Sequence, residues 1–164
     1  MLTQERLKEL FYYNPETGDF TRLVRTANNT KVGDIAGSLR TDGYLCITID
    51  FQHYYSHRLA VLYMTGLFPE NDIDHINGIK HDNKWLNLRK CNDSQNKQNQ
   101  KKAQKNNNST RLLGVYPHSS NNGTFVAQIM LNGKSKYLGI FKTKEEAHQK
   151  YLEAKRKLHE FNTL

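Results

Sequence analysis

The most informative stretch of the chain spans residues 74–96 and reads DHINGIKHDNKWLNLRKCNDSQN. Asp74 and His75 are neighbours, and a glycine follows three residues later. Asn87 lies twelve residues after His75, and Asn96 lies nine residues further on. An isolated Asp-His pair is usually two surface residues that are neighbours by chance. The complete spacing of these residues, followed by a polar and basic segment, indicates a functional site instead. The pattern predicts a strand that ends near the pair, then a turn, then a polar helix.

The residue types in this stretch suit phosphodiester hydrolysis. A neutral imidazole removes a proton from water close to neutral pH, and carboxylate and amide oxygens are ligands that a hard cation prefers. Side chains alternate along a regular strand, so Asp74 and His75 face one site only if the strand ends or twists there. The glycine just downstream favours such an end.

The same spacing resembles that of the HNH (His-Me finger) homing endonucleases of phage type. Residues 56–60, which read SHRLA, also resemble the segment that precedes the motif in that group. The resemblance covers about residues 40–105. It implies a ββα-metal nuclease module, in which a β-hairpin and a helix clasp one divalent cation.

The resemblance assigns a role to each polar residue of the motif. It implies that His75 is the general base and that Asn87 holds the loop and orients this base. It also implies that Asp74 and Asn96 bind the metal. Asn96 occupies the position of the histidine that ends the family name, and an amide oxygen is a harder ligand than an imidazole. We therefore expect one Mg²⁺ ion, with Mn²⁺ as the alternative.

Positive charge is concentrated after residue 79. Residues 1–79 carry a net charge of −3, residues 80–105 carry +6 and residues 106–164 carry +5. A basic half of this kind favours a polyanion partner, because each neutralised phosphate releases condensed counterions; a solvated basic surface is the alternative. We expect double-stranded DNA as the partner. The candidate contacts outside the C-terminal region are Arg58, Lys97, Lys101, Lys102 and Lys105.

The C-terminal residues predict a small sheet backed by one helix. Residues 124–131 alternate between apolar and polar side chains, and Asn132-Gly133 is the strongest short signal for a two-residue hairpin turn. This turn pairs Gln128 with Tyr137. Residues 143–146 form a capping box that starts a helix. The apolar stripe of this helix consists of Ala147, Tyr151, Ala154, Leu158 and Phe161.

This C-terminal region resembles the plant-like AP-two/ethylene-response-factor DNA-binding domain. The similar motifs are GV at 114–115, FVAQI at 125–129 and YLGIF at 137–141. In that family the sheet lies in the major groove and the helix packs behind it. The chain lacks the Arg and Trp side chains of the plant members on this face, so base-specific readout is expected to be weak. The implied DNA-facing residues include Tyr116, His118, Gln128 and Tyr137, with Lys134 as a phosphate contact.

The remaining sequence completes an α+β chain in two parts. Periodicity predicts helices over residues 3–13 and 56–64, and strands over residues 19–24 and 44–51. The polar run at residues 95–108 has too few apolar side chains to belong to a core and marks a boundary. The expected parts are an HNH nuclease domain at 1–105 with its ββα-metal core at about 68–105, a linker at 106–112, and a DNA-binding domain at 113–164, in which a three-stranded antiparallel sheet packs on one helix.

Several other classes of protein are disfavoured. No apolar stretch reaches the roughly 18–20 residues of a membrane span, and no charged-then-apolar leader opens the chain. Cys46 and Cys91 lie far apart without a CxxC partner, which argues against a disulfide framework or a zinc ribbon. We therefore expect a cytoplasmic protein with no membrane association and no protein partner.

Together these features predict a metal-dependent DNA endonuclease of the homing type, which nicks one strand or cleaves both. The alternative is a non-catalytic, sequence-specific DNA-binding regulator. RNA recognition is disfavoured, because the alternating strand lacks the aromatic stacking platform of single-strand readers.

Overall fold

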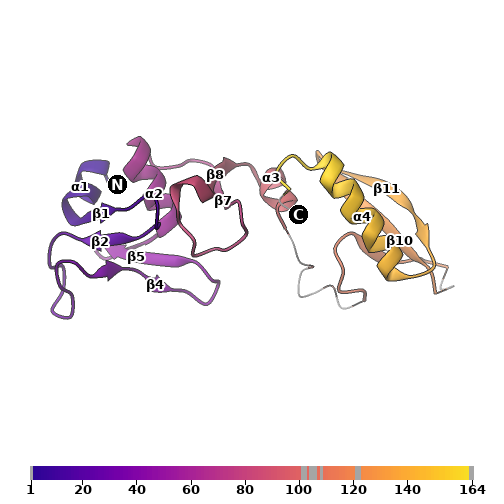
Figure 1. The fold of residues 1–164 in the computed structure, drawn as a ribbon, viewed down its shortest axis with the longest axis horizontal. Coiled ribbons are helices and arrows are strands. Elements are labelled where there is room, and N and C mark those ends of the chain that lie inside the picture. The colour runs from indigo at the N-terminus through magenta and orange to yellow at the C-terminus, as the bar shows by residue number, and fades with distance from the viewer. Residues whose placement is uncertain (1, 101–102, 104–106, 108, 121–122, 163–164) are drawn as a thin grey trace. The chain divides into compact units, whose positions relative to one another are not determined.

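The computed structural model describes residues 2–100, 103, 107, 109–120 and 123–162. It has an α+β fold of small antiparallel sheets and a few helices, as predicted (Figure 1). The chain divides into two compact units, Met1–Cys91 and Asn92–Leu164. No helix within the described ranges has the length and hydrophobicity that a membrane crossing requires.

The N-terminal elements of the first unit are a helix and a three-stranded sheet. They are α1 (Gln4–Leu10), β1 (Phe11–Tyr13), β2 (Phe20–Arg22) and β3 (Ile35–Ala36), with strand order β1-β2-β3. Thr3 caps α1 by accepting a hydrogen bond from the N–H of Arg6. The predicted helix over residues 3–13 is too long. Phe11 and Tyr13 belong to a strand instead, because strand alternation buries both rings while Tyr12 points to solvent.

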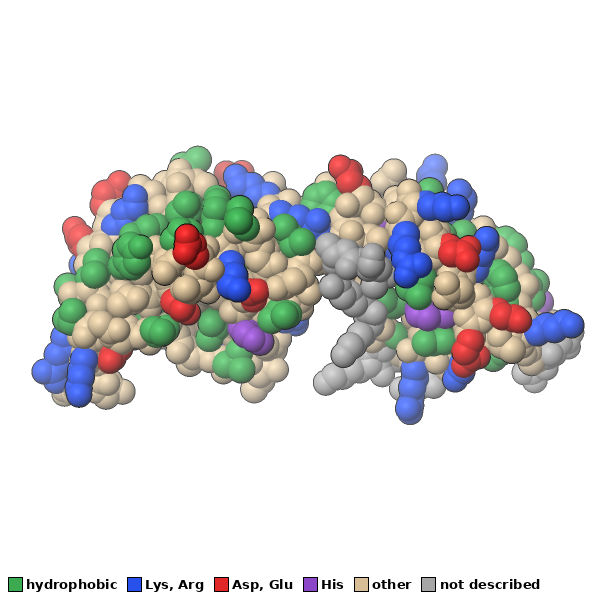
Figure 2. Space-filling view, viewed as in Figure 1, with side chains coloured by type: hydrophobic (Ala, Val, Ile, Leu, Met, Phe, Trp, Pro, Cys, Tyr) green, Lys and Arg blue, Asp and Glu red, His purple; other side chains and the backbone are tan. Residues whose placement is uncertain are grey.

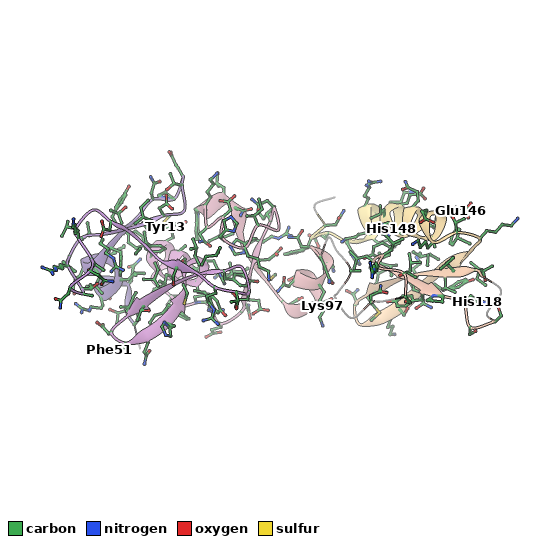
Figure 3. All side chains as sticks on the ribbon, turned by 90° about the horizontal axis from the view of Figure 1, so that it is seen from below. Tyr13, Phe51, Lys97, His118, Glu146 and His148 are labelled. Carbon is green, nitrogen blue, oxygen red and sulfur yellow. The ribbon has the colours of Figure 1, made fainter. Side chains whose placement is uncertain are left out.

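A second three-stranded sheet leads directly into a helix. The elements are β4 (Ser38–Leu39), β5 (Leu45–Ile49), β6 (Gln52–Tyr55) and α2 (Ser56–Thr65). The predicted strand within residues 44–51 and the predicted helix over residues 56–64 are confirmed. Gly66 ends the helix with a left-handed φ of 77°. The tip of the β5–β6 hairpin carries Phe51, whose ring is fully exposed (Figure 3).

Aromatic rings form the core of the first unit. The ring centre of Phe20 lies 4.8 Å from that of Tyr13 and 6.2 Å from that of Tyr63. Leu7 of α1 and Leu59 of α2 are fully buried in the same cluster. Because close packing of this kind restricts movement, the side chain of Tyr13 has a fixed position in the core.

The central segment of the sequence folds as a hairpin with a long connection. Its elements are β7 (Asp72–His75), a short 3-10 helix η1 (Trp85–Asn87) and β8 (Leu88–Cys91). The two strands are antiparallel, so Asp74 lies opposite Arg89 and His75 lies opposite Leu88. The Asp-His pair therefore ends its strand, as the sequence predicted.

The second unit begins with a short helix, α3 (Asp93–Gln98), which Asn92 caps. The predicted nuclease domain extends further, to residue 105, but α3 and its neighbours pack with the C-terminal residues. The N–H of Phe161 donates to Oε1 of Gln98 at 3.3 Å. Nζ of Lys155 donates to the carbonyl of Gln100. These contacts explain why the compact unit starts before the polar run rather than after it.

The rest of the second unit is a three-stranded antiparallel sheet packed on one helix, as predicted. The elements are β9 (Val115–Pro117), β10 (Phe125–Leu131), β11 (Lys134–Phe141) and α4 (Lys144–Leu158), with strand order β11-β10-β9. Asn132-Gly133 makes the tight turn, and Gln128 pairs with Tyr137 as expected. The capping box at residues 143–146 is confirmed. Val115, Ala127 and Ala147 form the buried contact between sheet and helix.

The buried face of α4 differs from the predicted stripe. Ala147 and Tyr151 are buried as expected, but the next buried residue is Lys155, only 1% exposed, whereas Leu158 is 38% exposed. Phe161 lies beyond the end of the helix. Steps of four residues keep these buried positions on one face. Lys155 can occupy that face because its ammonium group lies 6.0 Å from the ring centre of Tyr151 and donates to a backbone carbonyl.

Candidate active site

The Asp-His pair is buried at the end of β7. Asp74 is 7% exposed and His75 is 4% exposed. The Nε and Nη2 atoms of Arg89 donate to Oδ2 of Asp74 at 2.9 and 2.7 Å. A carboxylate removed from water needs such a partner, because an unpaired buried charge is costly. Arg89 thus holds the Asp74 carboxylate in place, a role that sequence reasoning did not assign, although cross-strand pairing of opposite charges is a recognisable signal.

Asn87 closes the connection between β7 and β8. Its Oδ1 atom accepts a hydrogen bond from the N–H of Asn77 at 3.0 Å. Its Nδ2 atom donates to Oδ1 of Asn77 at 3.1 Å and to the carbonyl of Asp82 at 2.6 Å. The side chain of Asn77 also donates to Oδ2 of Asp82 at 2.7 Å. This geometry is compatible with the predicted loop-holding role, which stays a prediction for catalysis.

Asn83 is a partner of His75 that sequence reasoning missed. The residue is 1% exposed, and its Oδ1 atom lies 3.1 Å from Nε2 of His75. Its Nδ2 atom donates to the carbonyl of His81 at 3.3 Å. Its own carbonyl accepts a hydrogen bond from the hydroxyl of Tyr13 at 2.7 Å. In the sequence an Asn between Asp and Lys looks like a loop residue, and no local signal reveals its burial.

Aromatic rings lie beside His75. The ring of His57, buried at the start of α2, has its centre 5.1 Å from that of His75 at an angle of 77°, and the ring of Tyr44 lies 5.9 Å away. Burial lowers the pKa of His57 to about 3. Burial also lowers the pKa of His75 and outweighs the hydrogen bond to Asn83, which raises it. Both imidazoles are therefore neutral close to neutral pH, which is the form that a general base requires.

The donor chemistry of the predicted metal ligands fits a hard divalent cation. Asp74 offers a carboxylate and Asn96 an amide oxygen, the donor types that Mg²⁺ prefers. Asn96 is exposed on α3 in the second unit. The part of the chain that the structure describes holds no cluster of three or more His, Cys, Asp or Glu side chains able to bind a metal. The predicted pair consists of one carboxylate and one amide, which is not a cluster of this kind. The absence therefore does not bear on Asp74 and Asn96, and the metal site stays a prediction.

Arg58 is used within the first unit. Its guanidinium group donates to the carbonyls of Pro69 and Asn71 and lies 5.1 Å from the ring centre of Phe68. These contacts fasten the segment that leads into β7. The structure therefore gives Arg58 a positioning role within the first unit, and its contact with DNA stays a prediction.

The predicted lysine contacts are only partly described. Lys97 is exposed on α3 (Figure 3), which suits a phosphate contact. Three further predicted contacts lie outside the described residues, namely Lys101, Lys102 and Lys105.

The outer face of the sheet in the second unit carries most of the remaining predicted contacts. Tyr116 is 52% exposed and Tyr137 is 57% exposed. Gln128 lies beside Tyr137, and its Oε1 atom accepts a hydrogen bond from the hydroxyl of Ser135 at 3.1 Å. Met130, 56% exposed, continues this face. Strand pairing therefore groups these side chains on one face of the sheet, and their contact with DNA stays a prediction.

The other two predicted contacts are His118 and Lys134. His118 follows β9, and its Nδ1 atom lies 2.5 Å from the hydroxyl of Ser120. Lys134 is exposed but pairs with Leu131, which puts both side chains on the opposite face from Gln128. Other Lys and Arg side chains are spread over the visible face of the unit that contains α4 (Figure 2), in keeping with the net charge of +5 after residue 105.

A family model described as HNH endonuclease matches residues 54–98. The match starts within β6 and ends with α3, so it includes the Asp-His pair, the connection between β7 and β8, and Asn96. No curated protein and no solved structure gives a significant match to the chain. The match supports an HNH endonuclease domain at these residues, and with it a nuclease that acts on DNA.

Proposed function

We propose that this protein is a metal-dependent DNA endonuclease of the homing type, with His75 as the general base. One observation carries the proposal: a buried, neutral imidazole, bonded through Nε2 to Asn83, ends a strand inside the segment that matches the HNH endonuclease model. The resemblance to phage homing enzymes supports the homing role. Strand nicking is the simpler expectation for one site per chain.

In the proposed reaction His75 takes the proton of an attacking water. The water oxygen forms a bond to phosphorus as the bond from phosphorus to the 3′ oxygen breaks. The rings of His57 and Tyr44 pack beside the imidazole and restrict its rotation. Asn87 keeps the connection after β7 closed, so the backbone around the base has one conformation.

Asp74 and Asn96 would hold the divalent cation, with Mg²⁺ as the first choice and Mn²⁺ as the second. When bound, such an ion stabilises negative charge on the phosphate and on the leaving oxygen. Arg89 contributes by fixing the orientation of the Asp74 carboxylate before any ligand arrives.

The second unit is proposed to bind the flanking duplex. Tyr116, Gln128 and Tyr137 present an exposed polar and aromatic face on its sheet, and the resemblance to AP-two/ethylene-response-factor domains supports major-groove contact. The basic charge of this part supplies phosphate affinity, which positions the protein without specifying sequence.

The proposal is tested by incubating the full chain with supercoiled plasmid and Mg²⁺. We expect open-circle product from the wild type. His75→Ala should lower the nicking rate by about 10²- to 10⁴-fold, because general-base catalysis contributes about that factor, while affinity for DNA is retained. His53→Ala, at an exposed position on β6, is the matched control and should cleave normally.

Two outcomes would overturn the enzymatic proposal. One is a His75→Ala variant that nicks as fast as the wild type. The other is a wild-type chain that binds duplex DNA tightly yet gives no product with Mg²⁺ or Mn²⁺ on a genomic library, which is the behaviour of a non-catalytic DNA-binding regulator.

A further inference from the structure

The contact between His75 and Asn83 determines which ring nitrogen of His75 carries the proton. The Nδ2 atom of Asn83 faces the carbonyl of His81. A carbonyl only accepts hydrogen bonds, so the amide nitrogen must be the atom on that side. The amide oxygen therefore faces Nε2 of His75, at 3.1 Å. Since this oxygen is also only an acceptor, Nε2 must be the protonated nitrogen, and the lone pair is left on Nδ1.

Residues 13 and 15, much earlier in the chain, hydrogen-bond to the backbone of Asn83 and of Trp85. The hydroxyl of Tyr13 donates to the carbonyl of Asn83 at 2.7 Å in the buried interior. Burial raises the pKa of Tyr13, so its hydroxyl keeps the proton that it donates. The carbonyl of Pro15 accepts a hydrogen bond from the N–H of Trp85 at 2.9 Å. Both contacts come from the strand and turn after α1.

Gly18 shows how closely this segment approaches Asn83. A Cβ atom at position 18 would lie 2.5 Å from the carbonyl carbon of Asn83 and 2.5 Å from the N–H nitrogen of Lys84. The backbone φ at this position is +83°, which L side chains rarely adopt. Only glycine therefore fits, and the backbone at Gly18 packs directly against the peptide group after Asn83.

We propose that Asn83 is a positioning residue for the His75 base, because it keeps the ring proton on Nε2 and so makes Nδ1 the basic atom. The inference rests on the proposed function. Asn83 acts through His75 and does not itself need to touch DNA.

The decisive experiment compares Asn83→Leu with Tyr13→Phe. Leucine has the same number and branching of heavy side-chain atoms as asparagine but accepts no hydrogen bond, so it removes the acceptor for Nε2. Phenylalanine at position 13 removes the other buried hydrogen bond to the same residue but leaves its amide in place. Asn83→Leu loses the hydrogen bonds of the amide to His75 and to the carbonyl of His81, whereas Tyr13→Phe loses one hydrogen bond, and only the first variant alters the partner of the base. Asn83→Asp keeps an acceptor oxygen for Nε2 and loses only the donor to the carbonyl of His81, so it separates the two hydrogen bonds of the amide.

The first readout is the ¹⁵N NMR spectrum of the imidazole of His75 in the full, metal-free chain at about pH 9, where the ring is neutral. We expect the Nε2–H tautomer in the wild type, Tyr13→Phe and Asn83→Asp, and a mixture of tautomers in Asn83→Leu. The second readout is nicking kinetics. Asn83→Leu should lower kcat about tenfold or more with the KM for DNA within about twofold, because the base is misoriented while binding is intact.

An unchanged tautomer in Asn83→Leu overturns the proposal whatever the activity. A shifted tautomer with an unchanged kcat overturns the positioning role. A wild-type chain that nicks no DNA overturns the proposed function and, with it, the catalytic half of this inference. The ring spectrum still decides the structural half in that case, so the two failures are distinguishable.

Discussion

Two hairpins of this protein share antiparallel pairing but differ in how their strands are connected. β10 and β11 meet through the two residues Asn132-Gly133. β7 and β8 are connected by residues 76–87, which fold back through side-chain bonds of Asn77 and Asn87. The tight turn leaves an open sheet face with exposed tyrosines, whereas the long connection encloses the His75 ring. A buried polar site in a hairpin thus needs a connection long enough to carry its own hydrogen-bond partners.

The largest expected effect is on the long connection. Asn87→Ala removes three side-chain hydrogen bonds, and at about 1 kcal/mol each the first unit should lose about 3 kcal/mol of unfolding free energy. Urea unfolding followed by fluorescence of Trp85, the single tryptophan of the chain, measures this directly. Leu86→Ala, at a position 89% exposed, is the matched control and should change little. A loss below about 1 kcal/mol would show that the side-chain hydrogen bonds of Asn87 add little to the stability of the first unit.

A smaller effect is expected from pH. Folding lowers the pKa of His57 from 6.5 to about 3, so the unfolded state binds more protons between these values and the first unit loses stability as the pH falls below 6.5. At pH 5 the loss from this residue should be about 2 kcal/mol. His57→Phe should reduce this dependence, and His53→Gln should not. Equal acid sensitivity in all three proteins would contradict the role of His57 burial.

The smallest effect is expected at the tight turn. Asn132 has a left-handed φ of 48°, and Asn tolerates this conformation better than residues without a short polar side chain. Asn132→Ala should therefore destabilise the second unit by about 1 kcal/mol, and Asn132→Gly should be nearly neutral. Amide hydrogen exchange of β10 and β11 measures both variants. An alanine variant as stable as the wild type would mean that the turn does not set the register.

Local signals made much of the fold predictable. The Asn132-Gly133 turn gave the correct strand register because its residues favour one turn geometry regardless of context. The helix before Tyr13 was predicted too long, because burial of alternate rings in a strand outweighed helical spacing. Lys155 was missed as a buried residue because its partner, the carbonyl of Gln100, comes from a distant part of the chain.

The candidate site was predictable only in part. The motif spacing pointed to Asp74, His75 and Asn87, and the structure locates all three in the β7–β8 hairpin and its connection. Asn83 and Arg89 could not be assigned roles from spacing, since Asn83 depends on a hydroxyl from Tyr13, 70 residues earlier. The contact between Tyr13 and Asn83 has no signature in a single sequence, whereas the opposite charges of Asp74 and Arg89 on paired strands are a signal that spacing alone does not use.

The close approach of Gly18 to Asn83 has a consequence for engineering. The stretch that matches the HNH model begins at residue 54, yet the backbone of Asn83 is contacted by Tyr13 and Gly18, which lie outside the match. A fragment trimmed to the matching stretch, or grafted into another scaffold, would lack the Tyr13 hydrogen bond and the Gly18 contact that support Asn83. Any chimera that aims to reuse the proposed site should therefore include β1 and the turn that follows it.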